Sequence, residues 1–136
     1  MDNRYKFRAW DPLNKEMHYM KMALYQGDEQ KAFVLPQEEQ SLANAYSSMN
    51  LDAVVIMQCS GSLATKSYRG EEPDDKLLYD GDIVYIPDWQ CYSVVYWYLG
   101  SWFLKFDSCD EYLYENAGMC EIVGTIHEHP ELLSKI

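Results

Sequence analysis

The amino-acid sequence predicts a β-rich α+β fold within a single domain. Its 136 residues are the usual length of one domain, and a chain of this length buries roughly two-thirds of the surface that it exposes when unfolded. Aromatic residues make up 15% of the chain, with 12 tyrosines, and aromatic side chains favour strands because they pack well on a pleated surface. Strand-like runs dominate residues 77–126, whereas helical spacing recurs in one earlier segment.

A β-hairpin is expected near the N-terminus. Residues 5–10 alternate between two faces, as a strand does. Residues 11–15 are typical of a turn, because Pro fixes φ and Asp or Asn bonds to the local backbone. Residues 16–22 are then the expected partner strand, and residues 32–35 a further short extended piece before a proline.

The next segment is predicted to be helical. In residues 37–50 the side chains of Leu42, Tyr46 and Met49 recur at helical spacing. The apolar, β-branched residues 51–58 suit a buried strand, and the polar residues 61–75 suit a loop. Within that loop, the acidic cluster of residues 71–75 is expected to face solvent.

Strands are expected from residue 77 onward. Residues 77–79 lead into the turn Asp80-Gly81-Asp82, where Gly tolerates positive φ, and then into a strand over residues 83–86. Residues 87–90 interrupt the pattern, and residues 119–126 form the last predicted strand. Pro130 suits the first position of a closing helical turn.

A second hairpin is expected over residues 93–106. A two-residue Gly100-Ser101 loop fits a type II′ turn and pairs Leu99 with Trp102, Trp97 with Leu104 and Val95 with Phe106. This register collects those six apolar side chains on one sequestered face. A slip by one residue would destroy this segregation. The opposite face carries Tyr96, Tyr98, Phe103 and Lys105.

Charge and cysteine content restrict the function. The net charge is -11, and residues 51–136 hold 15 acids and 5 bases, a local charge of -10. Direct nucleic-acid binding is not expected there, because binding to phosphates needs Lys and Arg. We expect a cytoplasmic protein without a membrane span, whose cysteines are reduced and act as small buried hydrophobes: Cys59, Cys91, Cys109 and Cys120.

Three ordered motifs carry a family resemblance. They are Phe7-Arg8-Ala9-Trp10-Asp11 with Lys15-Glu16-Met17, then residues 79–84 (YDGDIV), and finally residues 122–133 (IVGTIHEHPELL). In order and content they resemble the YopX family of phage and prophage proteins, whose function is uncharacterised. Cys59 and Ser60 depart from the family pattern of tyrosine-threonine-glycine, and the acidic stretch of residues 61–77 is longer than expected.

The resemblance implies a fold and a biological setting. It implies a single YopX-like domain over residues 1–136, with a small SH3-like antiparallel barrel at about residues 76–127. The N-terminal hairpin-plus-helix region, about residues 1–60, would then pack on that barrel. The setting would be the cytoplasm of a bacterial host that carries a phage or prophage.

No catalytic, cofactor or metal site is expected. His18, His127 and His129 lack the ligand pattern of a zinc site, which needs three or four ligands at recognisable spacing. Asp80 and Asp82 share a strand face, but paired carboxylates catalyse proton transfer only when their pKa values differ, and turn aspartates usually face water. An aromatic platform of Tyr96, Tyr98 and Phe103 has only Lys105 as a nearby cation, which is too few for single-stranded nucleic acid.

The sequence therefore leads to a ranked set of functions. The first is a non-enzymatic accessory protein that binds another protein through clustered aromatic side chains, with self-association also plausible. The alternative is an acidic mimic of DNA that inhibits a host DNA-binding or defence protein. An unrecognised small hydrolase is third, and would need a deep pocket lined by Asp80, Asp82 or His127.

Overall fold

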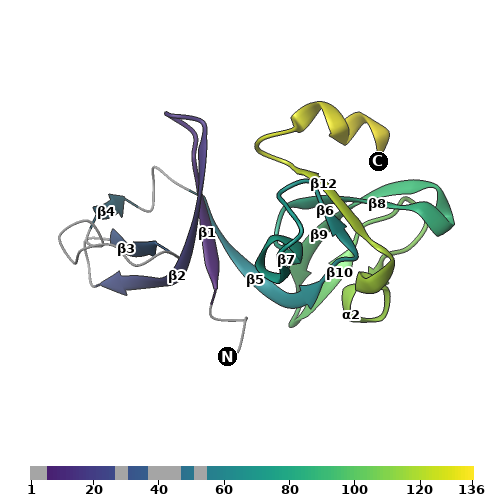
Figure 1. The fold of residues 1–136 in the computed structure, drawn as a ribbon, viewed down its shortest axis with the longest axis horizontal. Coiled ribbons are helices and arrows are strands. Elements are labelled where there is room, and N and C mark those ends of the chain that lie inside the picture. Colours follow the sequence, from purple (N-terminus) through teal and green to yellow (C-terminus); the bar gives the residue numbers. More distant parts are fainter. Residues whose placement is uncertain (1–5, 27–30, 37–46, 51–54) are drawn as a thin grey trace. The chain divides into compact units, whose positions relative to one another are not determined.

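Strands dominate the described structure, which is a computed structural model covering residues 6–26, 31–36, 47–50 and 55–136 (Figure 1). The chain separates into two compact units, Met1–Cys59 and Ser60–Ile136. We call them the N-terminal and the C-terminal unit, and each is described by itself. None of the helices in the described residues is long and apolar enough to cross a membrane.

The N-terminal unit is an antiparallel sheet in the strand order β4-β3-β2-β1-β5. Its strands are β1 (Phe7–Asp11), β2 (Glu16–Gln26), β3 (Lys31–Pro36), β4 (Ser47–Asn50) and the first part of β5 (Val55–Leu63). The predicted first hairpin is confirmed, with Asp11 opposite Glu16 and Trp10 opposite Met17. The Asp11 carboxylate closes the turn by accepting hydrogen bonds from the Leu13 N–H at 3.0 Å and the Asn14 side-chain amide at 2.8 Å.

The helix predicted over residues 37–50 is wrong at its C-terminal end. Residues 47–50 form β4, which pairs with β3 and places Met49 opposite Ala32. Helical spacing is a weak prior, and ladder hydrogen bonds to a neighbouring strand override it. Residues 37–46 lie outside the described residues, as do residues 51–54 of the next predicted strand.

The strand predicted over residues 51–58 is half-buried and not fully buried. Along β5, Met57 and Cys59 are 2% and 0% exposed, whereas Val55 is 41% exposed. The strand also runs on to Leu63, and β6 (Lys66–Ser67) follows, so part of the predicted loop is strand. The acidic segment itself is confirmed as solvent-facing, since Glu71 and Glu72 are exposed just before the short helix η3 (Pro73–Lys76) and Asp74 is exposed within it.

The C-terminal unit is built on a curled half-barrel sheet in the order β11-β10-β9-β8-β12-β6 (Figure 1). Its elements after β7 (Leu77–Tyr79) are β8 (Asp82–Ile86), η4 (Pro87–Trp89), β9 (Cys91–Tyr98), β10 (Ser101–Leu104), β11 (Glu111–Tyr112), α2 (Leu113–Asn116), η5 (Ala117–Met119), β12 (Glu121–Thr125) and η6 (Pro130–Lys135). The break after residue 86 and the helical turn that begins at Pro130 are both confirmed.

The core of this unit lies on the inner face of the curled sheet. Its largest buried side chains come from β7, β8, β9, β10, α2 and β12: Leu78, Val84, Ile86, Val95, Leu104, Leu113 and Ile122. Burial of each such aliphatic side chain contributes about 1.5–3 kcal/mol relative to exposure. Burial also raises the pKa of the Cys120 thiol, which belongs to this core, to about 12.

The second hairpin forms, but in a different register from the predicted one. Trp97 lies opposite Trp102, and Val95 lies opposite Leu104, so the loop is Leu99-Gly100 and not Gly100-Ser101. Leu99 and Gly100 have φ of 48° and 84°, and positive φ at both central positions is what a type I′ turn requires. A Leu in this conformation is strained, which is why the sequence favoured the other loop.

The register differs from the prediction by two residues, so the division of side chains between the two faces is retained. Val95 and Leu104 are fully buried on the inner face, as expected. The sequestration does not extend to the hairpin tip, where Trp97 is 50% and Leu99 is 85% exposed.

Gly124 marks a close approach in the last strand. The register against β8 shifts between Ile122 and Gly124, and a Cβ on Gly124 would lie 2.7 Å from Nδ1 of His129. The His129 ring therefore occupies the space that a side chain at residue 124 would need. Its Nδ1 accepts a hydrogen bond from the Thr125 N–H at 3.1 Å, which fixes the ring there.

We predict that Gly124→Ala destabilises the protein by about 1–3 kcal/mol, because the imidazole must leave its position on the strand. Urea unfolding followed by circular dichroism measures this change. Gly118→Ala is the matched control, with no atom within 4 Å of the added Cβ, and is expected to stay within about 0.5 kcal/mol of wild type. Adding His129→Ala to Gly124→Ala should relieve the clash, and a fully additive loss would contradict it.

Candidate functional site

Of the histidines weighed and rejected as metal ligands, His129 makes contacts that belong to the fold of the C-terminal unit. Besides its contact with Thr125, the His129 ring packs edge-on against Tyr68, with centroids 5.2 Å apart. The Tyr68 hydroxyl donates to the Glu128 carboxylate at 3.0 Å, and the Glu128 N–H donates to the Thr125 hydroxyl at 2.9 Å. These bonds tie the chain after β12 to the chain after β6, which is a structural role for His129.

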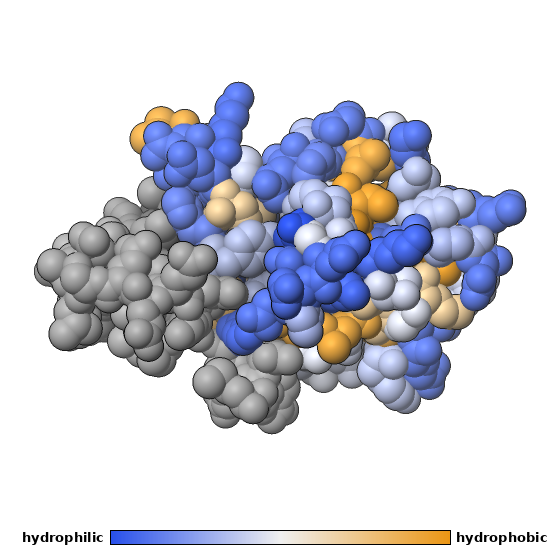
Figure 2. Space-filling view, in the orientation of Figure 1, coloured by the Kyte–Doolittle hydropathy of each residue, from blue (hydrophilic) through white to orange (hydrophobic). Residues whose placement is uncertain are grey.

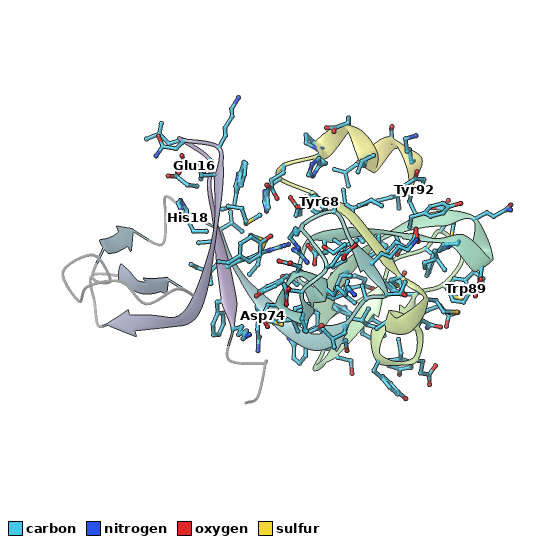
Figure 3. All side chains as sticks on the ribbon, viewed as in Figure 1. Glu16, His18, Tyr68, Asp74, Trp89 and Tyr92 are labelled. Atoms are coloured by element: carbon cyan, nitrogen blue, oxygen red, sulfur yellow. The ribbon has the colours of Figure 1, made fainter. Side chains whose placement is uncertain are left out.

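His18 lies on the first hairpin, where Nε2 is 3.4 Å from a Glu16 carboxylate oxygen (Figure 3). His18 belongs to the N-terminal unit, whereas His127 and His129 belong to the C-terminal unit. In the part of the chain that the structure describes, no three His, Cys, Asp or Glu side chains are grouped so as to hold a metal ion.

Asp82 is buried, which corrects the expectation that the turn aspartates face water. Its carboxylate is fully buried and lies 3.4 Å from Nη1 of Arg69, whose side chain is 10% exposed. It also accepts a hydrogen bond from the Tyr79 N–H at 2.8 Å, which closes the turn around Gly81. Asp82 is therefore part of a buried ion pair inside the fold.

Arg69 joins three segments of the C-terminal unit. Its Nη2 donates to the Leu77 carbonyl at 2.7 Å and its Nε donates to the Asp75 carbonyl at 3.1 Å. Its guanidinium carbon lies 5.7 Å from the Tyr79 ring centroid and 5.8 Å from that of Tyr68. A planar guanidinium suits this setting because it stacks on rings while donating within its own plane.

Two surface cavities of the C-terminal unit are lined by residues other than the histidine and the ion pair described above. One, of about 430 Å³, is bordered by residues of β6 and η3 and their connection: Thr65, Lys66, Ser67, Gly70, Glu71 and Lys76. The other, of about 210 Å³, is bordered by Trp89, Cys91, Phe106, Ser108, Cys109 and Glu111. Neither lining contains Asp80, Asp82 or His127, the residues that a hydrolase pocket was expected to use.

The prediction that all four cysteines are buried is correct for two of them. Cys59 and Cys120 are buried small hydrophobes, but Cys91 is half-buried and Cys109 is exposed. In the described structure none of the four forms a disulfide. Burial raises the pKa of the Cys91 thiol, which keeps it in the less reactive protonated form.

Aromatic rings form a continuous row on the outer face of the sheet. Tyr96 of β9 stacks on Phe103 of β10 with centroids 5.7 Å apart, and Phe103 stacks on Tyr112 of β11 at 5.1 Å. Tyr114 of α2 extends the row, 5.9 Å from Tyr112. Strand pairing sets this order, because Phe103 lies opposite Tyr96 on one side and Tyr112 on the other. We call these four side chains the aromatic row.

A carboxylate holds the hydroxyl at each end of the row. The Tyr96 hydroxyl donates to Asp110, whose other oxygen accepts the Phe106 N–H at 3.0 Å, and the Tyr114 hydroxyl donates to Glu115 at 3.1 Å. Burial and the Asp110 hydrogen bond raise the pKa of Tyr96 to about 12, and the bond to Glu115 raises the pKa of Tyr114. The Tyr96 hydrogen bond lowers the pKa of Asp110, so the neutral Tyr96 phenol faces a charged Asp110 carboxylate at pH 7.

Two of the four rings in the row, Tyr96 and Phe103, were predicted from the sequence. The pattern places them on one face with Tyr98, which is 58% exposed. Tyr112, Tyr114 and Asp110 were missed because β11 has only two residues and gives too short a pattern to recognise. The alternation in Tyr112-Leu113-Tyr114, with Leu113 fully buried, is the signal that was available.

We predict that Asp82→Asn costs about 3–5 kcal/mol of stability, because it removes the charge of a fully buried carboxylate that pairs with the Arg69 guanidinium. Chemical unfolding of purified variants provides the measurement. Glu121→Gln is the control, since it removes a pair at 4.0 Å whose Lys66 side chain is 78% exposed, and is expected to stay within about 0.5 kcal/mol. A similar loss in both variants would contradict the importance of burial.

We also predict that Asp110→Asn lowers the pKa of Tyr96 from about 12 toward the ordinary tyrosine value of 10.0. The ¹³Cζ signal of the Tyr96 ring, followed by NMR against pH, measures it. A raised pKa in the folded state gives stability that is complete below pH 10.0 and is lost as the pH rises to about 12. An unchanged Tyr96 titration in the variant would contradict the role of Asp110.

Comparisons with known proteins agree with this architecture. The chain is similar over 94% of its length to the crystal structure of protein EF1440 from Enterococcus faecalis, covering 96% of that chain with a TM-score of 0.60 and 23% identity, which shows the fold alone. No curated protein matches the chain. The family described as YopX protein matches residues 6–134, which is nearly the whole sequence, and the chain therefore belongs to the YopX family.

Proposed function

We propose that this protein is a non-enzymatic binding module that contacts another protein through the aromatic row. The observation behind the proposal is that four rings from separate elements form one row, in which Tyr96 and Phe103 are half-buried and Tyr112 and Tyr114 are exposed. Tyr112 is 46% and Tyr114 is 72% exposed, and Tyr98, two residues from Tyr96 on β9, is 58% exposed. Exposed aromatic side chains grouped in this way are typical anchors of protein interfaces.

The C-terminal unit that carries the row has a largely polar surface and an acidic sequence around the row. On the face that Figure 2 shows, the C-terminal unit is mostly hydrophilic, with small hydrophobic patches between. Residues 96–115 include four acids, Asp107, Asp110, Glu111 and Glu115, of which Asp110 and Glu115 bind hydroxyls of the row. An apolar centre with a polar rim is the usual composition of an interface that forms and dissociates.

Binding fits this chain better than catalysis because a carboxylate and an imidazole, the kinds of group that transfer protons in enzymes, already make contacts within the fold. The Asp82 carboxylate pairs with Arg69, and Nδ1 of His129 accepts the Thr125 N–H. Neither group is left to exchange a proton with a substrate. This supports the proposal of a protein that acts without catalysis.

The wider setting is also proposed. A phage or prophage accessory protein in the cytoplasm of the bacterial host fits the family and the acidic composition. The curled sheet of the C-terminal unit would then be the open form of a small SH3-like barrel, with its outer face presenting the row. If the bound protein is a second copy of this chain, the same face would form a homo-oligomer.

The acidic surface favours one further candidate, a mimic of DNA. The C-terminal unit, residues 60–136, holds 14 acidic and 5 basic residues, a formal charge of -9. Such a mimic would bind a DNA-binding or defence protein of the host through carboxylates and not through rings. The two candidates therefore respond differently to loss of the row.

We predict that a host partner binds the wild-type protein and is lost from a Tyr112→Ser/Tyr114→Ser variant. Affinity purification from the induced natural host with mass spectrometry, run in parallel on both proteins, is the measurement. Trp89→Ser is the matched control, because Trp89 is a 41%-exposed ring outside the row, and it should retain the partner.

The outcomes separate the candidates. A partner retained by the double variant and displaced by duplex DNA would support the mimic. Light scattering of the two proteins tests self-association, which the double variant should abolish if a second copy is the partner. If affinity purification recovers no specific protein and light scattering shows that the wild-type protein is a monomer, the proposed function is contradicted.

A further inference from the structure

We propose that the aromatic row recognises arginine side chains on a basic segment of its protein partner. This inference rests on the proposed function and adds the chemistry of the partner. The row offers ring faces between two carboxylates, and an arginine guanidinium is the protein group that binds both.

The ring geometry suits a planar cation. The Tyr96–Phe103 and Phe103–Tyr112 pairs have interplanar angles of 28° and 29°, so these rings present nearly parallel faces. Their centroids are more than 5 Å apart, which makes the stacking offset, and Tyr112 is 46% exposed. A guanidinium that stacks on these faces gains cation–π attraction without losing its in-plane donors.

The carboxylates at the two ends complete the recognition. Asp110 and Glu115 are exposed, and each accepts the hydroxyl of a row tyrosine. A carboxylate has about four acceptor positions, so these bonds leave further positions for an arriving guanidinium. Two arginines are needed to use both ends, which favours a segment with several arginines over a single one.

The protein binds one of its own arginines in the same manner. Inside the C-terminal unit the Arg69 guanidinium lies against the rings of Tyr68 and Tyr79, 5.8 Å and 5.7 Å from their centroids, while it pairs with Asp82. The row repeats this combination of rings and carboxylate at the surface. The internal example shows that this side-chain chemistry holds a guanidinium in this fold.

The overall charge attracts the same kind of partner. The C-terminal unit carries a formal charge of -9, and Lys105 is the single base between residues 96 and 115 in the sequence. An acidic surface raises the association rate of a basic segment and opposes an acidic one or a nucleic acid. Charge complementarity therefore selects a basic occupant, and the stacked rings select arginine over lysine.

The test is an NMR titration with the peptide Ser-Arg-Gly-Arg-Ser-Arg-Gly and with versions that carry lysine or citrulline at the three arginine positions. Chemical shifts of the Phe103 and Tyr112 rings report binding at the row. We expect the arginine peptide to bind about three- to tenfold more tightly than the lysine peptide, and citrulline to bind more weakly than both.

Variants separate stacking from charge. Tyr114→Ser should reduce the preference for arginine over lysine, and Glu115→Gln should weaken both peptides, while Trp89→Ser should leave both affinities unchanged. Equal affinity for arginine and lysine, or shift changes away from the row, would overturn the inference. If a host partner is lost from the Tyr112→Ser/Tyr114→Ser variant yet the arginine peptide does not bind, the inference fails and the proposed function stands.

Discussion

Alternation of side chains along β9 and β10 is the constraint on which the C-terminal unit depends. Val95 and Leu104 lie opposite each other and are fully buried on the inner face, where they join the core. Because successive strand residues point to opposite faces, their neighbours Tyr96 and Phe103 must lie on the outer face. The core therefore positions the aromatic row, and the two cannot be moved independently.

This period of two also explains how much of the fold and the site the sequence could predict. The predicted hairpin loop was displaced, yet the faces were right, because the register differs by two residues and only an odd slip exchanges the faces. The displacement itself depends on a positive φ at Leu99, which local propensity disfavours. Short elements such as β11 carry too few residues for a pattern, so half of the row was missed.

Burial of polar groups was the other property that the sequence could not supply. Asp82 lies in a turn signature that usually faces water, and its partner Arg69 is 13 residues away along the chain. The pairing exists only because the chain between β6 and β7 folds back over the turn at Gly81. An ion pair of this kind is determined by tertiary contacts. A turn depends on neighbouring residues, and the sequence could therefore predict it.

Order within the row before binding is what makes it suitable for recognition. The hydroxyl bonds to Asp110 and Glu115 hold the end rings, and cross-strand stacking holds Phe103 between Tyr96 and Tyr112. Rings that are already fixed lose little conformational entropy when a partner arrives, so more of the contact energy is available for binding. The same bonds keep both carboxylates beside the rings. The features that stabilise the outer face are therefore the ones that favour a planar cation on it.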